Sequence, residues 1–168
     1  MTKRLFILFL VMTLLLCVGC KQKTESPQDP VGVYYKRAQV SFGASDSVIS
    51  LAYIDAAGRK TDIEYLLNLY LANETGEEHA RTFPKGTTLI SIKMDALTAK
   101  IVLSDSFADL TGIDLSIACA CLTQTVISLT NCQEVIISAN NAKLDGQNFI
   151  TLSQDSYLLL DESSDTQE

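Results

Sequence analysis

The sequence contains no tryptophan, a single histidine and few aromatic residues. Aromatic side chains make up 7% of the 168 residues, so few rings are available on which sugars or nucleobases could stack. The lone histidine, His79, leaves little room for histidine-based metal binding or acid–base catalysis. A Gly-x-Ser-x-Gly motif and a glycine-rich phosphate loop are also missing. These absences favour a protein that is not an enzyme and that uses no metal or other cofactor.

Basic residues are scarce as well. Lysine and arginine number 13 against 20 aspartates and glutamates, which gives a formal charge of −7. A chain with this acid excess and no basic stripe repels a phosphate backbone, so we expect no nucleic-acid partner. The same charge argues against a polybasic contact with a membrane surface.

The N-terminus combines a short cationic stretch with an apolar run. Lys3 and Arg4 precede Leu5–Val18, a run of 14 residues, whereas a membrane-spanning helix needs about 20. This pattern is typical of a secretory signal peptide. The run ends in Leu-Cys-Val-Gly-Cys20, which resembles the lipobox of bacterial lipoproteins. The resemblance implies a signal peptide over 1–19 and a diacylglyceryl group on Cys20. An ordinary cleaved signal and an uncleaved anchor are the alternatives.

Polar segments flank the body of the chain. Residues 20–33 contain two prolines and mostly polar side chains, so we predict a lipidated cysteine followed by a flexible tether. Residues 161–168 are acidic and polar and are predicted to form a disordered tail. One folded domain over 34–160 remains, which is long enough for a single core.

Hydrophobic periodicity predicts alternating strands and helices in that domain. Period-two patterns predict strands, and spacing of three and four residues predicts helices. Asp62 is predicted to cap the first helix, Asp114 to cap the second and Asn131 to end it. Strands are expected over 48–54, 89–94, 99–104 and 135–138, with one or two closing strands over 149–160. Helices are expected over 64–72 and within 109–130. This order predicts an α+β fold in which two helices cover one face of a small mixed sheet, with βαββαβ order.

The middle of the chain resembles the sporulation and spore-germination (GerMN) domain. The family has a proline–x–glycine–threonine segment before a strand, and Pro84, Gly86 and Thr87 stand there. A leucine–serine pair and a nearby phenylalanine follow the next hairpin, as Leu103, Ser104 and Phe107 do here. One copy fits, between Val48 and Leu144. The resemblance implies a fold similar to ring-building modules and a protein-interaction role outside the cytoplasmic membrane.

Three cysteines in the second half of the domain invite a metal or redox hypothesis. Cys119 and Cys121 point about 200° apart on a helix and cannot jointly chelate an ion. We therefore favour core packing for Cys119, Cys121 and Cys132, with a Cys121–Cys132 disulfide and a metal or redox role as alternatives. Glu77-Glu78-His79 could bind a cation, but a solvated charged loop is the favoured interpretation.

These observations predict a lipoprotein anchored through Cys20 to the outer face of the cell membrane. We expect it to act as a protein-interaction or structural module in sporulation or germination, with an envelope protein and the lipid bilayer as partners. The alternative is a lipoprotein that binds a small ligand or a cell-wall fragment. A pocket lined by convergent polar groups would favour this alternative, and an exposed apolar patch would favour the interaction role.

Overall fold

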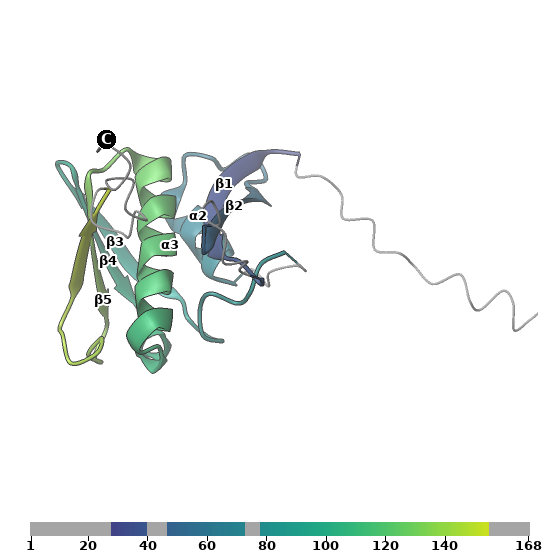
Figure 1. Cartoon of the computed structure of the whole chain (residues 1–168). Helices are drawn as coiled ribbons and strands as arrows, with labels where there is room; N and C mark the ends of the chain where they lie inside the picture. The colour runs from purple at the N-terminus through teal and green to yellow at the C-terminus, as the bar shows by residue number, and fades with distance from the viewer. Residues whose placement is uncertain (1–27, 40–46, 73–77, 155–168) are drawn as a thin grey trace, which may run out of the picture.

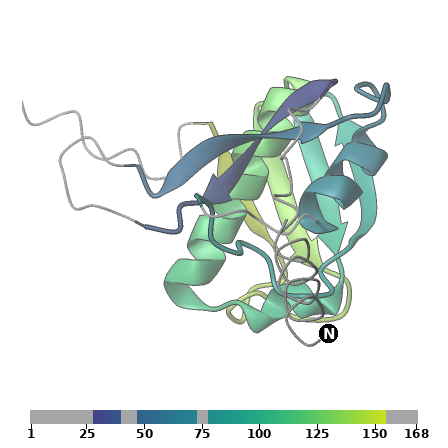
Figure 2. The same cartoon turned by 90° about the vertical axis from the view of Figure 1, so that its right-hand side faces the viewer.

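The computed structural model describes residues 28–39, 47–72 and 78–154. The helix α3 lies between a four-stranded sheet and a two-stranded ribbon, and α2 covers the same face of the sheet beside the ribbon (Figures 1 and 2). The elements in chain order are β1 (Pro30–Lys36), β2 (Ile49–Asp55), α2 (Ile63–Ala72), β3 (Leu89–Asp95), β4 (Thr98–Leu103), the 3-10 helix η1 (Asp105–Asp109), α3 (Gly112–Thr130), β5 (Glu134–Ala139) and β6 (Ile150–Ser153). The predicted α+β class is confirmed, and the predicted helices and strands follow one another in the predicted order as far as residue 154. β1 and η1 are additional elements that the sequence did not predict.

The four-stranded sheet, called the main sheet below, has the order β3-β4-β5-β6. β3 pairs antiparallel with β4, β4 runs parallel to β5, and β5 pairs antiparallel with β6. A parallel pair needs a long crossover, which η1 and α3 supply between β4 and β5. Both helices lie on one face of this mixed sheet, as predicted (Figure 1).

The strand β2 was expected to belong to the same sheet, and this expectation is wrong. It pairs antiparallel with β1 to form a separate ribbon on the side of α3 that faces away from the main sheet, in front of α3 in Figure 2. The predicted tether extended to residue 33, whereas β1 already begins at Pro30. The inward side chains Val31, Val33 and Tyr35 are all buried, and this alternation draws the segment into the core.

α3 is covered on two sides, because it lies between the main sheet and the ribbon (Figure 1). The apolar stripe that includes Leu115, Leu122 and Val126 is buried, as predicted. Thr123 and Thr125, which flank this stripe on its two sides, are buried too. By length and composition alone, α3 could cross a membrane. Its burial between the main sheet and the ribbon accounts for that apolar composition.

Two of the three predicted helix ends are confirmed. The Asp62 carboxylate accepts the Tyr65 N–H at 3.0 Å, at the start of α2. Asn131 ends α3 in the left-handed conformation, with φ 58° and ψ 23°. Asp114 is not the cap of α3: the helix begins at Gly112, so Asp114 lies in its first turn. There its carboxylate is still favourably placed near the positive end of the helix dipole.

The residues that carry the family resemblance connect the start of β3 to the end of β4 through hydrogen bonds. Gly86 has a φ of +88°, in the turn where the Thr87 N–H donates to the Pro84 carbonyl. The Ser104 hydroxyl donates to the Gly86 carbonyl at 3.1 Å and accepts the Thr88 N–H at 3.0 Å. These bonds join the segment before β3 to the segment after β4, so the motif residues have a structural role here.

The predicted signal peptide, Cys20 and the acidic tail over 161–168 lie outside the described residues. The lipidation site and the domain limits beyond 28 and 154 therefore stay predictions.

Candidate interaction surface

The free edge of β1 is covered by side chains of the protein itself. The N–H of Tyr34 donates to the Thr125 hydroxyl of α3 at 2.9 Å, and the Tyr34 carbonyl accepts the Tyr70 hydroxyl of α2 at 2.6 Å. The Thr125 hydroxyl also interacts with the Tyr70 hydroxyl. Burial raises the pKa of Tyr70 well above its usual value of 10.0, so the phenol stays protonated and can donate.

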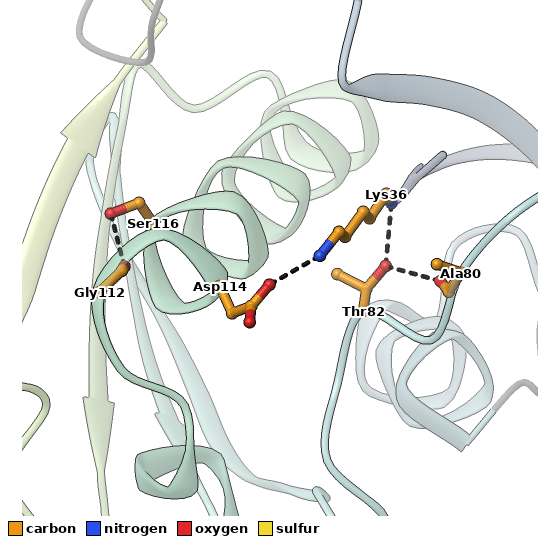
Figure 3. Close-up of polar contacts among 6 residues, drawn as sticks. All are labelled: Lys36, Ala80, Thr82, Gly112, Asp114 and Ser116. Atoms are coloured by element: carbon orange, nitrogen blue, oxygen red, sulfur yellow. Dashed lines mark hydrogen bonds and ion pairs between the residues drawn. The ribbon is translucent and has the colours of Figure 1, made fainter. Parts of the chain in front are cut away.

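The end of β1 is covered by the segment 78–82. The Lys36 N–H donates to the Thr82 hydroxyl at 2.9 Å, and the Lys36 carbonyl accepts the Ala80 N–H at 2.9 Å. The Lys36 ammonium reaches Asp114 at the start of α3, at 2.7 Å (Figure 3). Backbone and hydroxyl contacts thus satisfy the groups of Tyr34 and Lys36 that face away from β2.

The free edge of β2 differs, because no strand or capping side chain covers its central part among the described residues. Arg37 N–H donates to the Val48 carbonyl, which makes 37 and 48 a hydrogen-bonded pair of the ribbon. The pattern alternates along an antiparallel ladder, so the N–H and C=O groups of Ile49, Leu51 and Tyr53 point away from β1. Within the described ranges, one side chain reaches these groups: the Ser47 hydroxyl accepts the Ile49 N–H and donates to the Ile49 carbonyl, so the groups of Leu51 and Tyr53 are the ones left open.

The surface along this edge is apolar and uncharged. Val48, Leu51 and Tyr53 expose 37%, 44% and 60% of their surface. The stretch 47–54 contains no Asp, Glu, Lys or Arg, in a chain whose net charge is −7. We call residues 48–54 with their unpaired backbone groups the β2 edge.

Gly32 lets the side chains of the β2 edge lie across the ribbon. A Cβ at this position would stand 3.0 Å from Leu51 Cδ1 and 4.0 Å from a Tyr53 ring carbon. Both side chains therefore rest over the β1 backbone, and the hydrogen-bonding groups of the β2 edge stay open to the outside.

The two outer strands of the main sheet have features that discourage pairing. β3 has an irregular register between Leu89 and Ser91 and carries Lys93 and Asp95. β6 is only four residues long. Bulges, charges and short length are the usual protections of edge strands. Of the four strands at sheet or ribbon edges, β2 alone therefore lacks such protection in the described structure.

A second candidate site is a pocket of about 570 Å³ near the C-terminal end of α3. Its lining is uncharged and rich in side-chain amides: Tyr34, Gln124, Ile127, Ser128, Asn131, Cys132, Gln133 and Gln154. Amides can both donate and accept hydrogen bonds, so such a lining suits a neutral polar ligand. No sequence signal indicates this pocket, because its residues come from three separate segments.

The cysteines are buried free thiols, as the favoured interpretation predicts. Cys119, Cys121 and Cys132 are all free, so the Cys121–Cys132 disulfide is not formed. Burial raises the pKa of Cys119 and that of Cys121 to about 12, which keeps both thiols protonated and weakly nucleophilic near neutral pH. Within the described ranges, no three His, Cys, Asp or Glu side chains come close enough to share a metal ion.

His79 lies in a different environment from the solvated loop that was expected. It is half-buried, forms an isolated β-bridge with Arg37 and places its ring 5.9 Å from that of Tyr35. Its Nε2 is buried and has no hydrogen-bond partner among the described residues. The segment extends the ribbon, since the Ala38 N–H donates to the Glu78 carbonyl.

Comparison with known proteins gives structural matches only. The tandem GerMN domains of the sporulation protein GerM from Bacillus subtilis align at 16% identity with a TM-score of 0.53, over 81% of this chain and 51% of that one. The fold is GerMN-like. A provisionally assigned lipoprotein from Clostridium perfringens aligns at 13% identity with a TM-score of 0.47, over 75% of this chain and 89% of that one.

No family model matches the sequence, and no curated protein does either. The chain spans about half the length of the tandem GerMN structure. At this identity, the GerMN-like architecture is what the two proteins demonstrably share, and it agrees with the order of motifs in the sequence.

Proposed function

We propose that this protein is a lipid-anchored module on the outer face of the cell membrane that works by binding protein, in sporulation or spore germination. The observation that carries the proposal is the β2 edge, which is apolar, uncharged and open for strand pairing. An exposed edge of this kind is a template on which an extended segment can add a strand.

The chemistry of the domain supports a binding role over an enzymatic one. The buried cysteine thiols are protonated, and His79 packs against Tyr35. The GerMN-like fold and the lipobox-like sequence before Cys20 support the proposed location and the proposed cellular process.

The anchor is tested by substituting the two N-terminal cysteines separately. Cys20→Ala removes the proposed acyl acceptor and should move the protein from the detergent phase to the aqueous phase. Cys17→Ala is the matched control and should leave the partitioning unchanged. Detergent-phase recovery of the Cys20→Ala protein would contradict the lipoprotein assignment.

The binding role is tested by crosslinking in cells, followed by mass spectrometry of the captured proteins. We expect reproducible capture of envelope proteins of sporulation or germination by the anchored chain, and loss of that capture for the Cys20→Ala variant. A chain that captures no protein at all, itself included, would contradict the proposal.

The amide-lined pocket favours a second function, binding of a small neutral ligand or a cell-wall fragment. Gln124 and Gln133 line it from α3 and from the segment before β5. Soluble cell-wall glycan fragments can be titrated into the protein by calorimetry. Binding that disappears in the Gln124→Ala variant, while Thr151→Ala binds normally, would favour this second function.

A further inference from the structure

The β2 edge raises the question of which strand pairs with it. An incoming strand has to satisfy the backbone groups of Leu51 and Tyr53 and, at Ile49, to replace the Ser47 hydroxyl that now bonds both backbone groups. It must also tolerate the apolar side chains beside them. It must also approach a chain of net charge −7 at a stretch that offers no charge of either sign. A neutral, apolar strand meets these requirements, because a charged strand of either sign finds no charged partner in 47–54 and would place its charges against apolar side chains.

The β2 strand is itself such a strand. We infer that the β2 edge pairs antiparallel with the β2 edge of a second copy of this chain, about a two-fold axis at Leu51. This inference rests on the proposed function, because it names the partner that a membrane-anchored interaction module takes at this edge.

The two-fold register follows from the direction of the free backbone groups. Ile49, Leu51 and Tyr53 point their N–H and C=O groups outward, so these residues must form the hydrogen-bonded pairs of the new ladder. With the axis at Leu51, Leu51 lies opposite Leu51 of the second copy, and Ile49 lies opposite its Tyr53. Each apolar side chain on the outer face then meets another apolar side chain, which is the favourable combination across strands.

The same register keeps the acidic end of the strand away from its counterpart. Asp55 would lie opposite Ser47 of the second copy. The two Asp55 carboxylates would then stand at opposite ends of the shared ladder, about 27 Å apart for eight residues of strand. That separation exceeds the Debye length of about 8 Å at physiological ionic strength, so their repulsion is largely screened.

A single strand pair is a small interface, and small interfaces are transient in solution. Anchoring confines both copies to one thin layer and raises their effective concentration, so a weak contact can be well populated at the membrane. We therefore expect the pair to form chiefly with the anchored, full-length chain.

Crosslinking of the full-length lipidated protein in liposomes tests the pairing. Leu51→Cys places a thiol at the proposed axis, and a short bismaleimide should join two copies into a covalent dimer. Thr151→Cys, at an exposed position on the main sheet, is the matched control and should give little dimer. The native chain measures the background, which should be low because Cys119, Cys121 and Cys132 are buried.

Charged substitutions at the same position test the register. Leu51→Lys and Leu51→Glu each place like charges opposite one another, and each should lower the dimer fraction about tenfold or more. The dimer fraction is followed by resonance energy transfer between copies labelled at the Thr151→Cys thiol. A mixture of the two variants should restore the dimer, since an introduced ammonium then meets an introduced carboxylate wherever two different variants pair. Partitioning of every sample into the detergent phase reports separately whether the anchor is present.

The outcomes separate the inference from the proposed function. Dimer formation with Leu51→Cys, together with rescue by the mixed variants, supports the two-fold pair. Equal crosslinking of Leu51→Cys and Thr151→Cys overturns it. Capture of an envelope protein at position 51 without any self-dimer also overturns it, but leaves the proposed function intact.

Discussion

The Thr125 hydroxyl of α3 holds the ribbon through a hydrogen bond to β1. It accepts the Tyr34 N–H at 2.9 Å from inside α3, where the Thr125 side chain is fully buried. Thr125→Val keeps the shape of the side chain but removes the acceptor. The Tyr34 amide is then left without a partner in a partly buried position. An unsatisfied buried donor costs about 1–3 kcal/mol, so we expect a loss of about 2 kcal/mol in the free energy of unfolding.

Thr125→Ser is the matched control, because it keeps the hydroxyl and loses one methyl group. Burial of a methylene group contributes about 0.8 kcal/mol, so the serine variant should lose about half as much stability as the valine variant. Both free energies can be measured by urea denaturation of residues 21–168. With a slope of about 2 kcal/mol per molar urea, Thr125→Val should lower the midpoint by about 1 M. A valine variant as stable as the serine variant would refute the argument that this hydroxyl holds the β1 edge.

Three further predictions concern groups elsewhere in the domain. Because burial raises the pKa of Cys119 and Cys121 from 9.0 to about 12, stability should fall as pH rises from 9.0 towards 12, by about 1.4 kcal/mol per pH unit for each thiol. Urea midpoints at about pH 8 and about pH 11 should show a flatter decline in the Cys119→Ala/Cys121→Ala variant. The Tyr65 N–H and then Arg59 lower the pKa of Asp62 below 3.8, so its contribution is present above pH 3.8 and is lost as pH falls through the lower folded value. Asp62→Asn should accordingly flatten acid unfolding followed by circular dichroism. At Asn131, whose φ is 58°, glycine should preserve the urea midpoint, while alanine should cost about 1 kcal/mol.

The elements that the sequence predicts well are those with strong local signals. The stripe that includes Leu115, Leu122 and Val126 locates α3, and Asn131 marks its end. The alternation around Ile101 and Leu103 locates the β3–β4 hairpin. In these segments the local hydrophobic period and the tertiary contacts agree, so the sequence is sufficient.

The strand β1 could not be identified in the same way, because two signals compete in its sequence. Pro30 and the polar residues before it are typical of a tether, and they outweigh the short alternation Val31, Val33, Tyr35. A proline is compatible with the first position of a strand, where its missing N–H breaks no ladder bond. The partners of β1 are also distant in sequence, since Thr125 lies 91 residues away.

The candidate interaction surface shows a different limit. The sequence locates the apolar strand over 48–54, but an apolar strand can be central or lie at an edge. The strand pairing decides whether such a strand is central or lies at an edge. Among the described strands, β2 pairs with β1 alone and is not part of the main sheet. The amide pocket has the same character, because Tyr34 and Gln154 are brought to α3 by the tertiary fold.

The proposed anchor and the β2 edge bear on each other, because anchoring would raise the local concentration of a chain that has an open strand edge. An apolar edge such as Leu51 and Tyr53 present is a hazard for a protein at high local concentration, since copies meet often and can pair. Attachment through Cys20 would create that condition. β1 has its edge covered by Thr125, β3 carries charges and an irregular register, and β6 is short. If the proposed anchor holds its copies on one membrane, the contrast between three protected edges and one open edge in the described structure is best explained by pairing at the open edge.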